Sequence, residues 1–67
     1  MPKYPNIEVK LVGEDGNAFA ILGRVRKALK ENGVSEDEIL AFTEEAMSSD
    51  YSHLLATVMR TVRVPGE

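Results

Sequence analysis

Apolar and charged residues alternate in a short segment near the start of the chain. The alternating residues are Ile7, Glu8, Val9, Lys10 and Leu11. A period of two predicts a strand over residues 7–12, with its apolar side chains on one face. Residues 1–6 carry prolines at positions 2 and 5, which remove hydrogen-bond donors from a strand ladder, so we expect a loose arm there.

The apolar period lengthens to that of a helix after Asn17. The apolar residues at helical spacing are Ala18, Ile21, Leu22, Val25, Ala28 and Leu29. The side-chain oxygen of Asn17 or Asp15 can cap the start of this helix, and Asn32 with Gly33 is typical of its end. Gly23 lies inside the helix, where glycine costs about 0.5–1 kcal/mol relative to alanine. We therefore expect another backbone to approach closely at Gly23, with a bound ligand as the alternative.

A capping pattern marks the start of a second predicted helix. Ser35 lies three residues before Glu38, as in the reciprocal capping box, and acidic residues fill the first turn. The side expected to be buried consists of Ile39, Leu40, Phe42, Ala46 and Met47. The helix is expected to end near Ser48.

A third helix is predicted after Ser49 or Asp50, either of which can act as its cap. Its inward side chains are expected to be Tyr51, Leu54, Leu55, Val58 and Met59. The residues expected on its other side are His53, Thr57 and Arg60. The next segment is β-branched and alternating, which predicts a strand over residues 61–64, with continuation of the helix to Val62 as the alternative.

The order of the predicted elements is strand, helix, helix, helix, strand. Two short strands cannot bury themselves alone, so the expected fold class is α+β, with three helices packed on a two-stranded sheet formed by the N- and C-terminal strands. We expect one domain over residues 1–67, with residues 65–67 as a tail. The sequence leaves the direction of the strand pairing open. Exposed sheet edges make homodimerisation through one of them a hypothesis.

Size and composition narrow the class of protein. At 67 residues, with 43% hydrophobic and 28% charged residues, the chain falls in the range of a small folded domain. It contains no cysteine, so disulfides and cysteine-based zinc sites are excluded. No apolar run approaches the roughly 20 residues that span a bilayer, and the N-terminal segment lacks the apolar stretch of a signal peptide. We therefore expect a soluble, cytoplasmic protein without a membrane partner.

Charge is distributed unevenly along the chain, whose net charge is -3. The basic residues of the first predicted helix are Arg24, Arg26, Lys27 and Lys30. The acidic residues that form a candidate surface for another protein are Glu36, Asp37, Glu44 and Glu45. As neighbours the two helices are expected to attract each other, each exposed ion pair contributing about 0.2–1 kcal/mol. The basic residues are the alternative candidate, a surface for nucleic acid, although a few cations on an acidic domain fall short of the usual footprint.

The residues with reactive side chains form no recognised catalytic or metal-binding pattern. The single His53 cannot form a two-histidine metal motif. Asp50 and His53 are at helical spacing and could pair as orienting acid and base, but no recognised pattern places a serine nucleophile with them. The aromatic residues Phe19 and Phe42 are expected in the core, and Tyr51 is expected to pack with its hydroxyl at the surface. We predict no catalytic residue, no cofactor and no metal.

The segment Gly13-x-x-Gly16-Asn17, between a strand and a helix, invites comparison with phosphate-binding loops, because bare amides at a helix start attract anions. Glu14 and Asp15 would repel phosphate, and the remaining residues of the known phosphate-loop motifs are missing. A turn with a helix cap explains the segment better.

Three segments carry a pattern that is distinctive as a family signature. They are Gly13-x-Asp15-Gly16-Asn17-Ala18-Phe19, Ile21-x-Gly23 and Asp50-Tyr51-x-His53-Leu54-Leu55-Ala56-Thr57-x-Met59-Arg60. With these segments the chain resembles a family of small, uncharacterised bacteriophage and bacterial proteins, from Val9 to Val64. The resemblance implies no activity, but a phage-like origin favours a small regulator or a protein that binds a host factor.

Together these features favour a protein-interaction or regulatory module rather than an enzyme. The surface expected to bind is the acidic second helix or an exposed strand edge. Nucleic-acid binding through the basic first helix is the alternative. A small enzyme working around Asp50 and His53 is the third and least favoured hypothesis.

Overall fold

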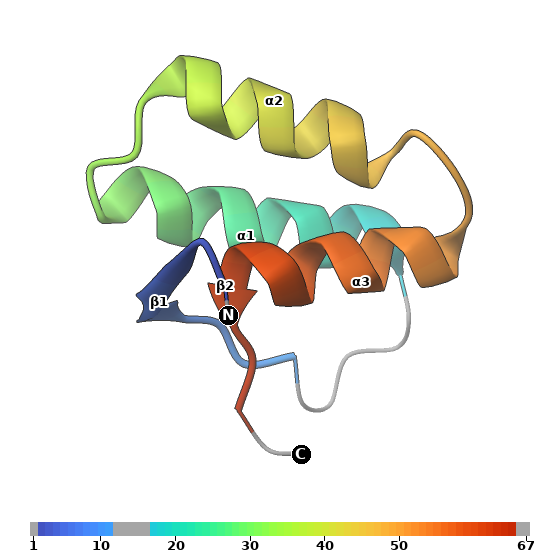
Figure 1. Cartoon of the computed structure of the whole chain (residues 1–67), viewed down its shortest axis with the longest axis horizontal. Coiled ribbons are helices and arrows are strands. Elements are labelled where there is room, and N and C mark those ends of the chain that lie inside the picture. The colour runs from blue at the N-terminus through green and yellow to red at the C-terminus, as the bar shows by residue number, and fades with distance from the viewer. Residues whose placement is uncertain (1, 12–16, 66–67) are drawn as a thin grey trace.

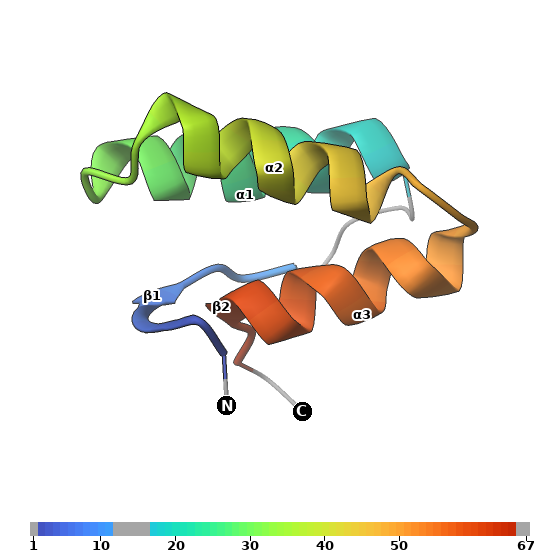
Figure 2. The same ribbon diagram turned by 45° about the horizontal axis from the view of Figure 1, so that its top comes forward.

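The chain folds into two layers of secondary structure. The computed structural model describes residues 2–11 and 17–65. The elements in chain order are β1 (Tyr4–Glu8), α1 (Ala18–Glu31), α2 (Glu36–Ala46), α3 (Tyr51–Thr61) and β2 (Val62–Arg63). Helices α1 and α2 lie side by side in one layer, and α3 lies in the other layer with the strands (Figure 1, Figure 2). The predicted α+β fold, with the order β-α-α-α-β, is confirmed.

The two strands pair in parallel, the direction that the sequence left open. Parallel strands need a long crossover connection, which the three helices supply. Tyr4 pairs with Val62 and Glu8 pairs with Arg63, so β1 bulges between its two paired positions. The Arg63 guanidinium also donates to the Glu8 carboxylate across the strands. The sheet is therefore short and irregular, and it closes the fold by joining the two ends of the described chain.

The first strand begins and ends earlier than the alternating pattern predicts. It starts at Tyr4, so residues 4–6 of the predicted loose arm belong to the strand. Pro5 is tolerated because it lies in the bulged part of β1, between the paired positions. Val9 and Leu11 lie beyond the strand but still pack on the core, so the predicted apolar face is correct. At the other end, β2 falls within the predicted residues 61–64.

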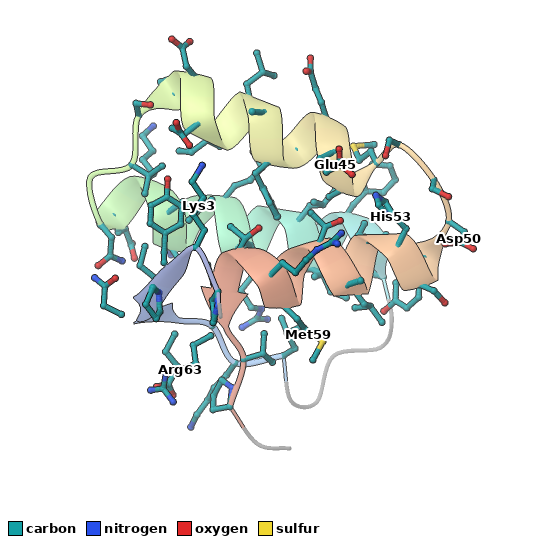
Figure 3. The ribbon with its side chains drawn as sticks, viewed as in Figure 1. Lys3, Glu45, Asp50, His53, Met59 and Arg63 are labelled. Carbon is teal, nitrogen blue, oxygen red and sulfur yellow. The ribbon has the colours of Figure 1, made fainter. Side chains whose placement is uncertain are left out.

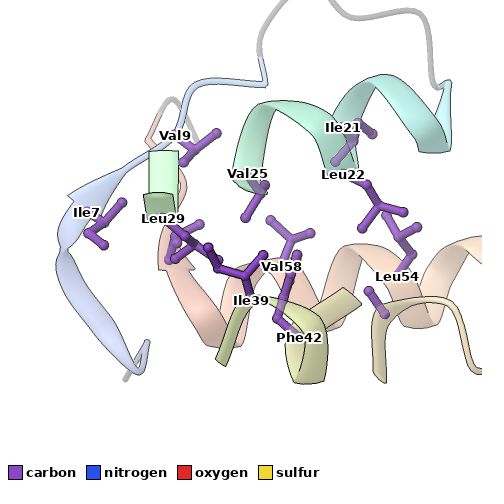
Figure 4. Packing of buried hydrophobic residues seen from close by; sticks show 12 residues of the cluster. Ile7, Val9, Ile21, Leu22, Val25, Leu29, Ile39, Phe42, Leu54 and Val58 are labelled. Carbon is purple, nitrogen blue, oxygen red and sulfur yellow. The ribbon is translucent and has the colours of Figure 1, made fainter. Parts of the chain in front are cut away.

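The core lies between the layers, where all the described elements contribute apolar side chains (Figure 4). Val25, Val58 and Val62, from α1, α3 and β2, are fully buried. The buried apolar residues are Ile7, Val9, Ile21, Leu22, Val25, Leu29, Ile39, Phe42, Ala46, Leu54, Val58 and Val62. Most of the residues predicted from the helical and strand periods belong to this set, so the periodicity identified the inward faces correctly.

Each helix begins at a cap that the sequence predicts. The backbone N–H of Phe19 donates to Asn17 Oδ1 (2.9 Å), and that of Glu38 donates to Ser35 Oγ (3.2 Å). The backbone N–H of His53 donates in the same way to Asp50 Oδ1 (2.9 Å). These bonds satisfy amides of the first helical turn that have no partner within the helix.

The remaining predictions on helix ends have mixed outcomes. Gly33 adopts φ of 82° after α1, the left-handed conformation that glycine tolerates, so the predicted stop is confirmed. The reciprocal half of the capping box is not formed, because the Glu38 carboxylate accepts from Lys3 and Tyr4 instead. Asp15, the alternative cap, and the predicted loop at positions 13–16 lie outside the described residues.

Several apolar side chains predicted to be buried are exposed. Their exposed fractions are 73% for Phe19, 57% for Leu40, 51% for Met47, 51% for Met59 and 40% for Tyr51. The prediction that these residues pack inward is therefore wrong. The inward faces of α2 and α3 are narrower than expected, because each helix contacts the core along one side only.

Thr57 differs in the opposite direction, since the sequence predicts it on the outer side of α3 and it is only 5% exposed. Its hydroxyl donates to the carbonyl oxygen of His53 one turn earlier (2.8 Å). A threonine that satisfies its hydroxyl in this way can be buried at little cost.

Gly23 also contradicts its prediction. It is exposed, and a β-carbon added there would meet no atom of the described residues within 4 Å outside its own helix. No other backbone in the described part of the chain approaches Gly23, so close packing does not explain the glycine.

Candidate interaction groove

A mainly apolar hollow opens where the start of α1, the end of α2 and the start of α3 meet. Its volume is about 190 Å³. The residues that line it are Ala18, Phe19, Leu22, Ala46, Met47, Ser49, Asp50, Tyr51 and Leu54. Three helix ends converge here, so the hollow forms part of the surface rather than of the buried core.

Three exposed apolar side chains contribute to this hollow, one from each helix end. Phe19 is 73% exposed, Met47 is 51% exposed and Tyr51 is 40% exposed. We call these residues the apolar rim. Apolar side chains grouped in this way on a small domain are characteristic of a contact surface, whereas scattered ones are ordinary.

Hydrogen bonds at the helix ends hold the backbone of the apolar rim in place. The cap at Asn17 fixes the first turn of α1, and the backbone N–H of Phe19 is one of its donors. The backbone N–H of Met47 donates to the Thr43 carbonyl (3.1 Å) and closes α2, and Asp50 caps α3 directly before Tyr51. The rim is therefore presented on a fixed frame, which reduces the entropy lost when a partner binds.

A second, polar hollow of about 320 Å³ lies between α1 and α2. The residues that line it are Gly23, Arg26, Lys27, Lys30, Glu36 and Ile39. The cations in this lining outnumber its single carboxylate, so the hollow has a positive balance of charge. It opens beside Gly23, where the helix surface carries no side chain.

The two hollows lie at opposite ends of the α1–α2 pair, and the apolar one also reaches the start of α3. Phe19, Gly23, Arg26 and Lys30 recur at steps of three or four residues in α1, so they form one stripe on that helix. The apolar hollow lies at the Phe19 end of this stripe and the polar hollow at the Lys30 end. We call this stripe of α1, together with the hollows at its two ends, the α1–α2 seam.

The acidic residues predicted as an interaction surface do not form a single patch. Glu36 lines the polar hollow beside basic side chains of α1. The Glu45 carboxylate lies 2.9 Å from the ring of His53. Asp37 and Glu44 are exposed and lie seven residues apart on α2, hence on the same side of that helix. Of the predicted surface, Glu45 is therefore engaged with another part of the same chain, and Glu36 lies near the cations of α1.

The basic residues predicted as a nucleic-acid surface are also divided. Arg26 and Lys30 line the polar hollow next to α2. Arg24 lines a different hollow, between α1 and the segment after β1, together with carboxylates of Glu8 and Glu31. Lys27 lies between the two hollows and lines both. Carboxylates accompany the cations in each hollow, which weakens the attraction for a phosphate backbone.

His53 ties the end of α2 to α3 and is only 27% exposed (Figure 3). Its Nε2 lies 2.9 Å from Glu45 Oε2, 3.0 Å from the Glu45 carbonyl oxygen and 3.2 Å from Ser48 Oγ. A carbonyl oxygen only accepts hydrogen bonds, so Nε2 carries a proton in this arrangement. These hydrogen-bond partners give His53 a structural role, the joining of α2 to α3. The sequence had placed this residue on the outer side of the helix.

The cluster around His53 differs from a hydrolytic triad. In a triad the acid and the serine contact different nitrogens of the ring, whereas here Glu45 and Ser48 both contact Nε2. Asp50, which the sequence paired with His53 as a catalytic hypothesis, binds the backbone N–H of that residue instead. Asp50 therefore does not orient the ring of His53, as that hypothesis required.

A second polar cluster joins the N-terminal segment to α2. The Lys3 ammonium donates to Glu38 Oε1 (2.7 Å), and the Tyr4 hydroxyl donates to the same oxygen (3.2 Å). The hydrogen bond and the charge attraction raise the pKa of Lys3 and lower the pKa of Glu38. Both side chains are exposed, so this cluster anchors the strand to the helix and encloses no reactive group.

Two kinds of feature are absent from residues 2–11 and 17–65. None of the helices in these ranges is long and apolar enough to cross a membrane. The same residues contain no group of three or more His, Cys, Asp or Glu side chains that could hold a metal ion.

Comparisons with protein-family models, curated proteins and solved structures found no significant match to this chain. The predicted resemblance to small bacteriophage and bacterial proteins therefore stays a prediction.

The apolar rim is a surface that the sequence predictions missed. The large apolar side chains of Phe19 and Met47 favour core positions for both residues. A signal was present for Phe19, which does not belong to the stripe that runs from Ala18 through Ile21 and Leu22. A large apolar residue beside the inward stripe of its helix is a candidate for the surface.

Proposed function

We propose that this protein is a small interaction module that binds another protein through the apolar rim. The observation that carries the proposal is the grouping of Phe19, Met47 and Tyr51, all exposed, around one hollow. Protein contacts typically centre on a few aromatic or methionine side chains that fill pockets of the partner, and these residue types are enriched there.

The apolar rim is a better candidate than the two surfaces expected from the sequence. The sheet offers little template for a further strand, because β2 has two residues and β1 is bulged. The acidic helix retains Asp37 and Glu44 as exposed acids, and Glu45 is paired with His53. The acid that lines the apolar hollow is Asp50, and an acid in that place fits the polar edge of an interface rather than its centre.

Two methionines provide a matched test of this proposal. Met47 and Met59 are both 51% exposed, but only Met47 lines the apolar hollow. Met59 lies on the side of α3 that faces away from α2 (Figure 3). Truncating either to alanine removes the same atoms from a similarly exposed position, so the two variants differ mainly in location.

The experiment compares proteins captured from a cell lysate by immobilised wild type, Met47→Ala and Met59→Ala, each quantified by mass spectrometry. A true partner is retained by wild type and by Met59→Ala. Its affinity for Met47→Ala falls by at least about fivefold, or about 1 kcal/mol, as expected for a side chain at the centre of an interface. Loss of capture with Met59→Ala alone, or equal capture by all three proteins, would contradict the proposal.

A further inference from the structure

The α1–α2 seam has two chemically different ends. The end at Phe19 is apolar, and the end at Arg26 and Lys30 carries a positive balance of charge. Along α1 the distance from Phe19 to Arg26 is about 10 Å and that to Lys30 about 16 Å, at about 1.5 Å per residue. An occupant that uses both ends must therefore extend over two to three helical turns.

The shape of the seam suits a helix more than an extended strand. The side chains of two neighbouring helices form ridges into which those of a third helix can pack, and α1 and α2 are neighbours (Figure 1) with a hollow at each end of the pair. Gly23 lies between the two ends of the stripe and is exposed, with open space where its side chain would be. A helix laid along the seam can approach closely at this point, and the missing side chain gives the glycine a role that internal packing does not.

Charge defines the occupant further. Arg26, Lys27 and Lys30 share the polar hollow with one carboxylate, that of Glu36. Acidic side chains on the occupant would be attracted to this end, and basic ones would be repelled. The apolar hollow at the other end suits a single large apolar side chain as an anchor.

We propose that the occupant of the α1–α2 seam is an amphipathic helix of a partner protein, anchored by a large apolar side chain at the apolar rim and carrying acidic residues opposite Arg26 and Lys30. The acids lie about seven to eleven positions from the anchor, because the occupant has the same rise per residue as α1. This inference rests on the proposed function and adds to it the conformation and charge of the partner segment.

The test selects binders from a displayed library of random peptides of about 16 residues, long enough to cover the seam as a helix. Selected peptides are expected to contain an apolar anchor and Asp or Glu at the stated spacing, and to gain helical circular dichroism when bound. Their affinity is measured for wild type, for Met47→Ala, for the double variant Arg26→Gln/Lys30→Gln, and for the control Arg60→Gln, an exposed cation on α3. All exchanged side chains are exposed, so the fold is retained and is verified by circular dichroism.

The double variant is expected to lose about tenfold in affinity and much of the salt dependence of binding, whereas Arg60→Gln changes affinity less than about twofold. Peptides that depend on Met47 but not on Arg26 or Lys30, or that bind without becoming helical, would overturn this inference and leave the proposed function standing. Failure to select any peptide that depends on Met47 would overturn both. A dimer in sedimentation that Met47→Ala dissociates would assign the seam to a second copy and overturn the inference.

Discussion

The replacement Gly23→Ala is expected to stabilise the protein. Gly23 is exposed within α1, away from both ends of the helix. The added β-carbon would meet no atom of the described residues within 4 Å outside its own helix, so the substitution neither fills a cavity nor creates a clash. Only the difference in helix propensity between glycine and alanine remains.

The size of that difference sets the expected effect. Alanine is favoured over glycine in a helix interior by about 0.8–1 kcal/mol, chiefly because glycine loses more backbone freedom on folding. For a domain of this size, about 1 kcal/mol raises Tm by roughly 4–8 °C. Whole domains of about 67 residues have unfolding free energies of only about 3–10 kcal/mol, so the gain is readily measured.

Urea and thermal unfolding followed by far-UV circular dichroism would measure the change. The matched control is Ala56→Gly, because Ala56 is exposed in α3 and the exchange reverses the chemistry. We expect this control to lower stability by about the amount that Gly23→Ala adds. An unchanged or lower stability for Gly23→Ala, with the control behaving as expected, would refute the open surroundings of Gly23.

Three further outcomes are expected. Leu29→Ala, at a position only 1% exposed, should cost about 2–5 kcal/mol in urea unfolding, a large share of the total stability; a loss below about 1 kcal/mol would contradict its place in the core. Phe19→Ser should change stability by less than about 0.5 kcal/mol because Phe19 is 73% exposed, so a larger loss would contradict that exposure. Glu38→Gln should lower stability at neutral pH and flatten its decline at acid pH. The reason is that Lys3 holds the pKa of Glu38 below 4.5, so its contribution is present above pH 4.5 and lost as the pH falls through the lowered value. If the free energy of unfolding of Glu38→Gln declined at acid pH as steeply as that of wild type, this role of the ion pair would be contradicted.

The elements of this fold were predictable because their signals are local. Asn17, Ser35 and Asp50 each mark a helix start within a few residues, and all three caps form. The period of apolar residues identified the inward faces because a buried stripe requires that spacing wherever the helix packs. Gly33 stops α1 through its own backbone conformation.

The predictions that failed depend on parts of the chain that are distant in sequence. The first strand begins at Tyr4 because its partner is Val62, and no local pattern shows that a bulge accommodates Pro5. Leu40 is exposed because no other described element covers its side of α2, which the apolar character of leucine does not reveal. The contact of Glu45 with His53 forms across the turn between two helices and depends on the angle at which they meet.

The apolar rim and the α1–α2 seam depend both on local sequence signals and on contacts between distant parts of the chain. The sequence identified Phe19, Met47 and Tyr51 as apolar residues of helices but placed them all inward. Their grouping at one surface hollow follows from how three helix ends meet, and that arrangement is a property of the tertiary structure. The cations at the other end of the seam were recognised from sequence, whereas their division between two hollows was not.

Methionine methyl groups report directly, and without any substitution, on whether a partner binds at the apolar rim. With ¹³C-labelled methionine methyls, NMR spectra are recorded for the free protein and for its complex with the captured partner or a selected peptide. We expect the Met47 resonance to shift or broaden while the Met59 resonance stays in place, since Met47 lies at the apolar rim and Met59 does not. A shift of Met59 with Met47 unmoved would contradict it.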